Sequence, residues 1–247
     1  MLLAIDIGNT NITFGIFKGQ RLLKKFSIPT RDFTLLKLKV PLGSKPIERA
    51  VICSVVPKVT REVGGALQQM GIHPLYIGKG ATVPIKNLYR WPRQVGQDRL
   101  VNAYAAVRRF GAPAIIVDFG TAITFDIVSK NKEYLGGMIL PGLNISLEAL
   151  AKRTALLPKV KLSLPREFIG RDTQSSMLSG MVFGMAGLTD ELIRKIKRKT
   201  GRKTLVIGTG GDIEVMRRFC RCFDRIEKDL TLQGLRLIGK SLDEKVK

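Results

Sequence analysis

The stretch 2–17, LLAIDIGNTNITFGIF, decides the fold of this chain. Its apolar residues 2–5 predict a short strand, the polar residues 6–10 predict a turn, and residues 12–17 predict a second strand. The stretch therefore predicts a β-hairpin with a polar, glycine-bearing tip. The same pattern returns at 114–128, AIIVDFGTAITFDIV, with one residue fewer in the turn. A repeat about half a chain later indicates two similar domains, each opening with a hairpin.

Strands and helices are expected to alternate after each hairpin. Two short apolar runs have the character of buried strands, at residues 50–56 and 204–207. Apolar residues at helical spacing predict a helix over 97–110, one or two helices over 173–199, and a last helix over 229–242. Gly111, just past the first of these helices, is typical of a helix C-terminus. This alternation predicts an α/β fold.

The repeat also predicts where the domains divide. We expect residues 1–112 to carry the first hairpin and a GxDR motif, and residues 113–247 to carry the second hairpin and a TGG turn. Two prolines and a glycine favour a loop over residues 37–46. The helical region 173–199 contains three glycines that would allow close packing, Gly180, Gly184 and Gly187.

Composition narrows the class of protein. The 247 residues are 45% hydrophobic and 25% charged, which is typical of a soluble globular chain. No apolar run reaches the ~18 residues of a membrane-spanning helix. Asp6 lies too close to Met1 for a secretory signal, so we expect a cytoplasmic protein. The three cysteines, Cys53, Cys220 and Cys222, have the spacing of neither a disulfide framework nor a zinc site.

The formal net charge of +22 is large for this length, and basic residues cluster at 194–203 and 217–225. Such a surface attracts nucleotides, nucleic acids and acidic lipids alike. No nucleic-acid recognition motif accompanies the charge, so solvated helix faces are the favoured interpretation. A specific nucleic-acid partner is not expected, although the charge keeps it open.

Both hairpin tips suit a phosphate ligand. In the first tip, backbone N–H groups and polar side chains of residues 8–11 can surround phosphate oxygens, and Asp6 can hold a hydrated Mg²⁺. The alternative is a turn whose polar groups serve only the local backbone. The matching turn at 118–121 favours the phosphate-binding interpretation, because a two-lobed nucleotide-binding site requires a turn with an aspartate and a glycine from each lobe.

Three further stretches are candidates for the site. Residues 206–211, VIGTGG, end a strand in a glycine turn suited to an adenosine or phosphate contact. Residues 136–142, GGMILPG, predict either a strand and turn near a ligand or a sharp connection. In the stretch 96–99, GQDR, Asp98 is either a helix cap or a general base, with Arg99 anchoring an anionic group.

The motifs in this order resemble those of type III pantothenate kinases. They are DxGNTN at 6–11, GxDR at 96–99, DFGTA at 118–122, GGxIxPG at 136–142 and TGG at 209–211, and the resemblance extends from residue 1 to about 238. It implies the actin-like ATPase (ribonuclease H-like) fold and a homodimer. It also implies transfer of the γ-phosphoryl group of ATP to pantothenate, the first step of coenzyme A synthesis, with Mg²⁺ and a monovalent cation, K⁺ or NH₄⁺.

The resemblance implies a role for each motif residue. Asp98 would be the general base, Asp6 would also bind Mg²⁺, and Asp118 would bind the monovalent cation. The implied ATP contacts are Asp6, Ile7, Gly8, Asn9, Thr10, Asn11, Ile12, Thr13, Thr121, Gly210 and Gly211. The implied pantothenate contacts are Tyr89, Gly96, Gln97, Asp98, Arg99 and Thr173. Arg99 would meet the pantothenate carboxylate, and the dimer partner would help to enclose Thr173.

Two positions depart from the family pattern. Arg90 stands where an acidic residue is usual, and Gln94 replaces a common glutamate. The added positive charge would favour anionic substrates. A regulatory nucleic-acid-binding protein of the same fold, a transcription accessory factor, is the alternative function. A different acceptor also stays open, because only Tyr89, Arg99 and Thr173 point to pantothenate itself.

Overall fold

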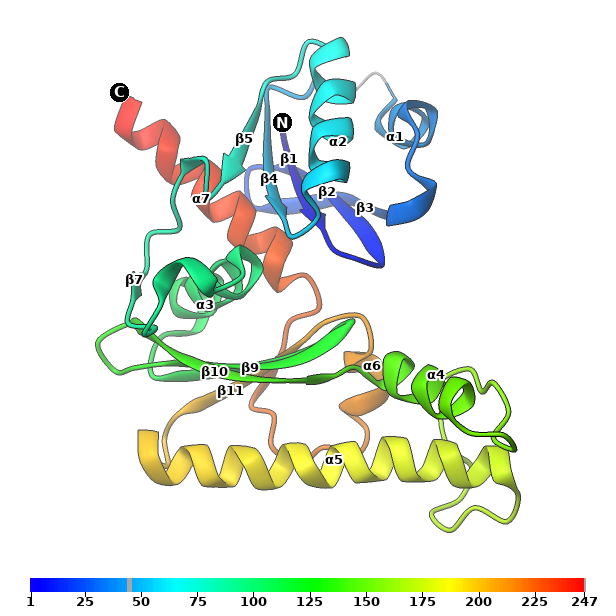
Figure 1. The fold of residues 1–247 in the computed structure, drawn as a ribbon. Coiled ribbons are helices and arrows are strands. Elements are labelled where there is room, and N and C mark those ends of the chain that lie inside the picture. Colours follow the sequence, from blue (N-terminus) through cyan, green and yellow to red (C-terminus); the bar gives the residue numbers. More distant parts are fainter. Residues whose placement is uncertain (44–45, 247) are drawn as a thin grey trace. The chain divides into compact units, whose positions relative to one another are not determined.

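The computed structural model describes residues 1–43 and 46–246, which form two compact units. Unit 1 comprises Met1–Ala105 and the segment that begins at Leu230, and unit 2 comprises Ala106–Asp229. The internal repeat predicts one domain boundary, between residues 112 and 113. In the structure, unit 2 begins at Ala106, and the chain returns to unit 1 for its last helix (Figure 1). Each unit is built on a mixed sheet.

The sheet of unit 1 has the strand order β3-β2-β1-β4-β5-β6. Its antiparallel strands are β1 (Leu2–Ile7), β2 (Asn11–Lys18) and β3 (Arg21–Pro29). The next three strands run parallel to β1, and they are β4 (Arg49–Ser54), β5 (Pro74–Ile77) and β6 (Gly80–Ala81). The first hairpin and the strand at 50–56 are therefore confirmed.

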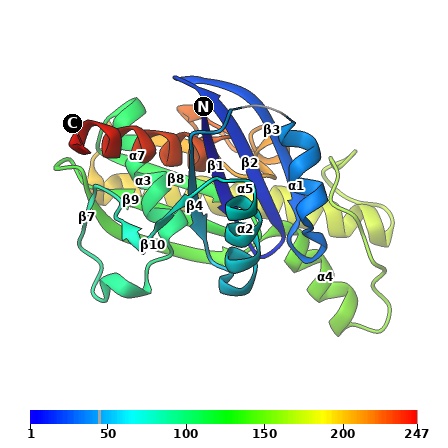
Figure 2. The ribbon, with the colours of Figure 1, turned by 90° about the horizontal axis from the view of Figure 1, so that it is seen from above.

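Helices cover both faces of this sheet (Figures 1 and 2). On one face, α1 (Leu35–Leu42) and α2 (Pro57–Gln69) share a core with the buried side chains of β1, β2 and β4. On the other face, α7 (Leu230–Val246) packs against β1 and β4. The remaining elements are η1 (Thr30–Asp32), β7 (Lys86–Asn87), η2 (Pro92–Gln94) and α3 (Gln97–Phe110), which leads into unit 2.

The predicted loop over 37–46 is wrong for residues 37–42, since α1 ends only at Leu42. Thr34 begins this helix by accepting a hydrogen bond from the Lys37 N–H at 3.3 Å. Leu38 and Leu42 lie four residues apart and are both buried against the sheet. Burial of this apolar face outweighs the proline in the last turn of the helix. Residues 44–45 lie outside the described residues.

Unit 2 repeats the strand arrangement of unit 1. Its strands run in the order β12-β11-β8-β9-β10. Three of them are antiparallel, namely β8 (Ala114–Phe119), β9 (Ala122–Val128) and β10 (Glu133–Pro141). On the other side of β8, two strands run parallel to it, namely β11 (Leu205–Thr209) and β12 (Arg225–Ile226). Its helices are α4 (Leu143–Arg153), α5 (Thr173–Thr200) and α6 (Ile213–Met216). The second hairpin and the strand at 204–207 are confirmed.

The internal repeat is also confirmed by the strand register. Asp6 pairs with Thr13 across the first hairpin, and Asp118 pairs with Thr124 across the second. The parallel neighbour of Asp6 is Cys53, and that of Asp118 is Thr209. Each unit thus places an aspartate at the carboxyl end of its central strand, where open α/β sheets bind ligands.

The helical region 173–199 is a single helix, α5, of 28 residues, which lies along one face of the unit 2 sheet (Figure 1). Gly201 ends it in a left-handed conformation, with φ of +105°. The three glycines of α5 are exposed, and a Cβ on Gly180, Gly184 or Gly187 would meet nothing within 4 Å in the described chain. The prediction that they allow close packing is therefore wrong within unit 2.

Gly234 lets α7 approach α3 closely in unit 1. A Cβ there would lie 2.6 Å from Val101 Cγ1 and 2.8 Å from the Val101 carbonyl oxygen. Gly234→Ala is expected to lower the free energy of unfolding by about 1–3 kcal/mol, because the backbone of α3 must move. The control is Gly65→Ala in α2, where the space is open, and a gain of roughly 0.5–1 kcal/mol is expected. Urea titrations of both variants test this, and equal shifts would contradict it.

Candidate active site

A polar row crosses the sheet of unit 1 at the carboxyl end of β1. The register places Ser27, Thr13, Asp6 and Cys53 next to one another on β3, β2, β1 and β4. Paired residues of neighbouring strands project on the same face, so these four side chains share one face of the sheet. The Ser27 hydroxyl donates to Thr13 Oγ1 at 3.3 Å. Sequence reasoning missed Ser27 and Cys53, because only the pairing of strands reveals the row.

The first hairpin tip is a tight turn braced from the side by Thr30. The Gly8 N–H donates to the Asn11 carbonyl at 3.0 Å. The Thr30 hydroxyl donates to the Gly8 carbonyl at 2.7 Å, and the Thr30 N–H donates to the Thr10 carbonyl at 2.9 Å. The side chains of Asn9, Thr10 and Asn11 are exposed at this tip. These bonds therefore fix the backbone that carries three exposed polar side chains.

Two of the implied ATP contacts, Ile7 and Ile12, belong to the hydrophobic core. They pair with each other at the end of the β1–β2 ladder, and both side chains are fully buried. Any contact that these two residues make with a nucleotide is consequently limited to their main-chain atoms.

Asp98 stands in the first turn of α3, where its carboxylate folds back over the helix start. Its Oδ1 accepts a hydrogen bond from the Arg99 N–H at 2.9 Å. A Cβ on Gly96 would collide with that same oxygen, so a larger residue there would displace the carboxylate from this position. Burial raises the pKa of Asp98, although the Arg99 amide and the Arg99 charge act in the opposite direction. The carboxylate is thus both a cap and a partly desolvated candidate base.

Asp6 and Asp98 lie in the same region of unit 1, around Cys53. Burial raises the pKa of the Cys53 thiol, and the negative charges of Asp6 and then Asp98 raise it further. Solvent screens charges that lie more than a Debye length apart, about 10 Å at 0.1 M salt, so both aspartates lie in the neighbourhood of this thiol. The fold therefore brings the first hairpin and the GxDR motif together.

The other implied pantothenate residues of unit 1 lie in the first turn of α3 and in the segment before it. Arg99 is only 7% exposed, and the Gln97 side chain packs on Gly78, whose φ is +84°. The Tyr89 N–H donates to Asn87 Oδ1 at 3.0 Å, so Asn87 fixes the backbone that carries the tyrosine. Tyr89 itself is half-buried.

Three glycine-bearing loops meet in unit 2, after β8, β10 and β11. A Cβ on Gly210 would collide with Asp118 Oδ1, and one on Gly142 would collide with the Thr121 carbonyl. The Gly142 N–H donates to that carbonyl at 3.1 Å. The DFGTA, GGxIxPG and TGG motifs are therefore neighbours in space, and Asp118 and Thr121 lie together with Gly210.

Two polar side chains that sequence reasoning did not single out join the same loops. Asn144 Nδ2 donates to Asp212 Oδ2 at 3.2 Å. The Asp212 N–H donates to the Phe119 carbonyl at 3.0 Å. Burial raises the pKa of Asp212, while the hydrogen bond from Asn144 opposes this shift. The available signal was the position of Asp212 directly after the TGG turn.

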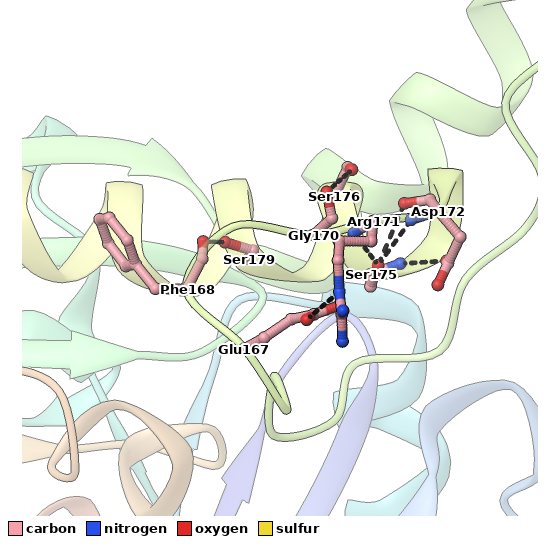
Figure 3. Close-up of polar contacts among 8 residues, drawn as sticks. All are labelled: Glu167, Phe168, Gly170, Arg171, Asp172, Ser175, Ser176 and Ser179. Atoms are coloured by element: carbon pink, nitrogen blue, oxygen red, sulfur yellow. Dashed lines mark hydrogen bonds and ion pairs between the residues drawn. The ribbon is translucent and has the colours of Figure 1, made fainter.

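Thr173 is the first residue of α5 and lines an open pocket of about 620 Å³. The turn before it is held by a capping box, in which Asp172 Oδ1 accepts from the Ser175 N–H at 2.8 Å (Figure 3). Arg171 Nε donates to Glu167 Oε2 at 2.8 Å in the same turn (Figure 3). The pocket walls are Leu157, Gly170, Arg171, Asp172, Thr173, Ser176 and Met177.

The basic clusters of the sequence lie in unit 2, on α5 and on the segment around 217–225. Part of their charge is paired, as between Arg194 and Glu191 and between Arg217 and Glu214. Lys197, at 3.5 Å from Asp224, and its neighbours in the last turn of α5 also complement the helix dipole. Their interpretation as solvated helix faces stays a prediction.

The donor atoms available for cations are oxygens. Within residues 1–43 and 46–246, no three His, Cys, Asp or Glu side chains gather as a metal cage. Mg²⁺ keeps several waters and uses one or two carboxylates with substrate phosphates, so the Asp6 carboxylate fits it. The Asp118 carboxylate and the carbonyls of its loop suit a hard monovalent cation. Over the same residues, no helix is long and apolar enough to cross a bilayer.

The two repeated sheets, each with an aspartate-bearing hairpin, have the actin-like ATPase fold. A crystal structure from Campylobacter jejuni, assigned to the Baf family of transcriptional activators, is similar with a TM-score of 0.60 and 22% identity, covering 98% of this chain and 99% of that chain. The 2-hydroxyisocaproyl-CoA dehydratase activator from Clostridium difficile is similar with a TM-score of 0.54 and 13% identity, covering 98% of this chain and 97% of that chain. At these identities, the likeness shows the fold alone.

Sequence comparison identifies the family among proteins of that fold. The model of the type III pantothenate kinase family matches residues 2–195. A Finegoldia magna protein named type III pantothenate kinase is 42% identical over 253 residues, covering 97% of each chain. The chain therefore belongs to the type III pantothenate kinase family, as the order of its motifs predicted.

Proposed function

We propose that this protein phosphorylates pantothenate with ATP to give 4′-phosphopantothenate, the first step of coenzyme A synthesis, in the cytoplasm. The observation that carries the proposal is family membership over nearly the whole chain, with Asp98 of the GxDR motif gathered near Asp6. The alternative, a regulatory nucleic-acid-binding protein, is not favoured by the relatives, which are named as kinases.

Asp98 acts as the general base in this proposal. The primary hydroxyl oxygen of pantothenate forms a bond to the γ-phosphorus, and the bond from that phosphorus to the β,γ-bridging oxygen breaks, releasing ADP. The hydroxyl proton passes to the Asp98 carboxylate. A carboxylate whose pKa is raised by burial is a better proton acceptor than an ordinary one. Phosphoryl transfer otherwise depends on positioning and charge.

Pantothenate is held by the motif residues that the family resemblance implied. The Arg99 guanidinium pairs with the pantothenate carboxylate, as its buried position beside Asp98 supports. Gly96 and Gln97 position the acceptor at the helix start, and Tyr89, fixed by Asn87, lines the pocket. Thr173 contributes from the pocket at the start of α5.

ATP is bound by the hairpin tips and the TGG turn. The polar side chains of Asn9, Thr10, Asn11 and Thr13 and the main chain of residues 7–12 contact phosphates. Thr121, Gly210 and Gly211 are further contacts of the nucleotide. Asp6 would hold Mg²⁺ and Asp118 the monovalent cation, K⁺ or NH₄⁺. When bound, these cations neutralise charge on the phosphates.

We also propose a homodimer. Phe168 and Ile169 are 70% and 76% exposed beside the Thr173 pocket, and the exposed glycines of α5 offer a second surface without side chains. Exposed apolar groups of this size favour a protein partner. Sedimentation equilibrium should give a dimer at micromolar concentration, and a monomer there would overturn this part of the proposal.

The experiment that tests the function is an ADP-release assay with ATP, Mg²⁺ and K⁺, run with and without pantothenate. Pantothenate-dependent turnover is expected. ADP release that is indifferent to pantothenate would exclude this acceptor. If no turnover occurs while a known pantothenate kinase works in the same buffer, the kinase function itself is wrong.

The pH profile of kcat provides an independent check on the base. Asp98 must be ionised to accept the proton, and burial raises its pKa. Activity should therefore fall, as pH is lowered, at a pH above the ordinary aspartate range of about 3.9. The test is kcat against pH at saturating substrates. An acid limb at or below that range would contradict the assignment.

A further inference from the structure

The pair Asn144–Asp212 has no role in the reaction as proposed so far. It joins the start of α4 to the residue after the TGG turn, through a hydrogen bond of 3.2 Å. The backbone of Asp212 is also fixed, since its N–H donates to Phe119 and its carbonyl accepts from the Val215 and Met216 N–H groups at 3.1 and 3.2 Å. The backbone of Asp212 is therefore fixed beside Asp118 and Gly210.

The chemistry of this pair excludes phosphate as its direct ligand. An ionised carboxylate only accepts hydrogen bonds, and phosphate oxygens are acceptors of the same charge. Asp212 is half-buried and has no cationic partner among the described residues. One amide donor leaves most of the acceptor capacity of its two oxygens unused. A partly desolvated carboxylate with unused acceptor capacity is stabilised by a ligand that donates a hydrogen bond to it.

On a nucleotide, the groups that can donate to this pair are the ribose hydroxyls and the adenine amino group. Asn144 uses its Nδ2 on Asp212, so its Oδ1 is a second acceptor next to the carboxylate. Two adjacent acceptors match the two adjacent hydroxyls of a ribose. The adenine amino group carries both of its N–H donors on one nitrogen, whereas the diol presents its two donors on adjacent carbons, and a carboxylate that accepts from a ribose hydroxyl is a known solution in nucleotide-binding α/β folds.

We propose that Asp212 and Asn144 bind the ribose 2′,3′-diol of the nucleotide co-substrate and make the enzyme selective for ribonucleotides. This inference rests on the proposed kinase function. It assigns the TGG turn to the nucleoside side of ATP, with Asp212 as a specificity-determining residue that takes no part in proton transfer.

The test compares ATP, 2′-deoxy-ATP and 3′-deoxy-ATP as phosphoryl donors to pantothenate. Wild type should show a KM for each deoxy analogue roughly tenfold above that for ATP, because a donor to the pair is lost. Asp212→Ala should raise the KM for ATP about tenfold at nearly unchanged kcat, and should bring the three KM values together. Asn144→Ala should do the same to a smaller extent.

The matched control is Glu214→Gln, two residues further on, whose carboxylate is ion-paired with Arg217 and Lys228. It should keep the wild-type preference for ATP. If Asp212→Ala also keeps that preference, or loses kcat at constant KM, the ribose assignment is wrong.

A direct binding measurement separates this inference from the kinase function. Calorimetric titration of the full chain with ATP and 2′-deoxy-ATP, with Mg²⁺ and without pantothenate, needs no turnover. A ribonucleotide preference that Asp212→Asn removes supports the ribose site even if pantothenate is not the acceptor. Equal affinities of wild type for the two nucleotides would overturn it, whatever the acceptor.

Discussion

Asp98→Asn is expected to lower kcat by about a thousandfold, while the KM values for ATP and pantothenate change little. The amide keeps the shape of the side chain and can still accept from the Arg99 N–H. It cannot take the hydroxyl proton, and positioned bases contribute about 10²–10⁴-fold in rate. Steady-state ADP release as a function of pantothenate measures both parameters.

Asp32→Asn is the matched control for this variant. Asp32 is an exposed carboxylate of unit 1, with Arg31 at 3.7 Å. Its substitution should leave kcat within about twofold, because exposed pairs of this kind contribute little. If Asp98→Asn retains more than about a tenth of the wild-type kcat, Asp98 is a helix cap and the base lies elsewhere.

Gly210→Ala is expected to disrupt the TGG turn and to lower the stability of the protein by about 3 kcal/mol. The φ of Gly210 is +98°, which L side chains rarely adopt. The added Cβ would also collide with Asp118 Oδ1 and lie 2.6 Å from the Phe119 backbone. The KM for ATP should rise as well, since the loops of Asp118 and Thr121 must shift.

The adjacent glycine provides the control. A Cβ on Gly211 would meet nothing within 4 Å, and its φ is not in the left-handed region. Gly211→Ala should therefore stay within about 0.5 kcal/mol of wild type in a urea titration. Similar losses in both variants would show that the close contact with Asp118 does not control the turn.

Local patterns were sufficient for the elements that the sequence predicted correctly. Each hairpin has an apolar run, a polar glycine turn and a second run, and this pattern needs no distant partner. The helix over 97–110 has helical spacing and a glycine at its end, and Gly111 indeed has a φ of +97°. The order of the motifs also sufficed for the family, which matches over residues 2–195.

Local patterns failed where distant burial decided the conformation. The prolines at 41 and 46 favoured a loop, but Leu38 and Leu42 bury against the sheet and make α1 a helix. The glycines of α5 suggested close packing, yet they face away from the core of unit 2. In both helices, the packing of the whole unit determines which face of the helix contacts the sheet.

The sequence by itself determined the α/β class, the repeated hairpins and the aspartates at their tips, because these follow from residues close together along the chain. Only the tertiary structure decided that α7 returns to unit 1, that Asp98 lies near Asp6 and Cys53, and that Asn144 meets Asp212. These contacts depend on strand register and on close approaches at glycines such as Gly234 and Gly210. Neither can be read from local periodicity, since both arise when segments far apart in sequence pack together.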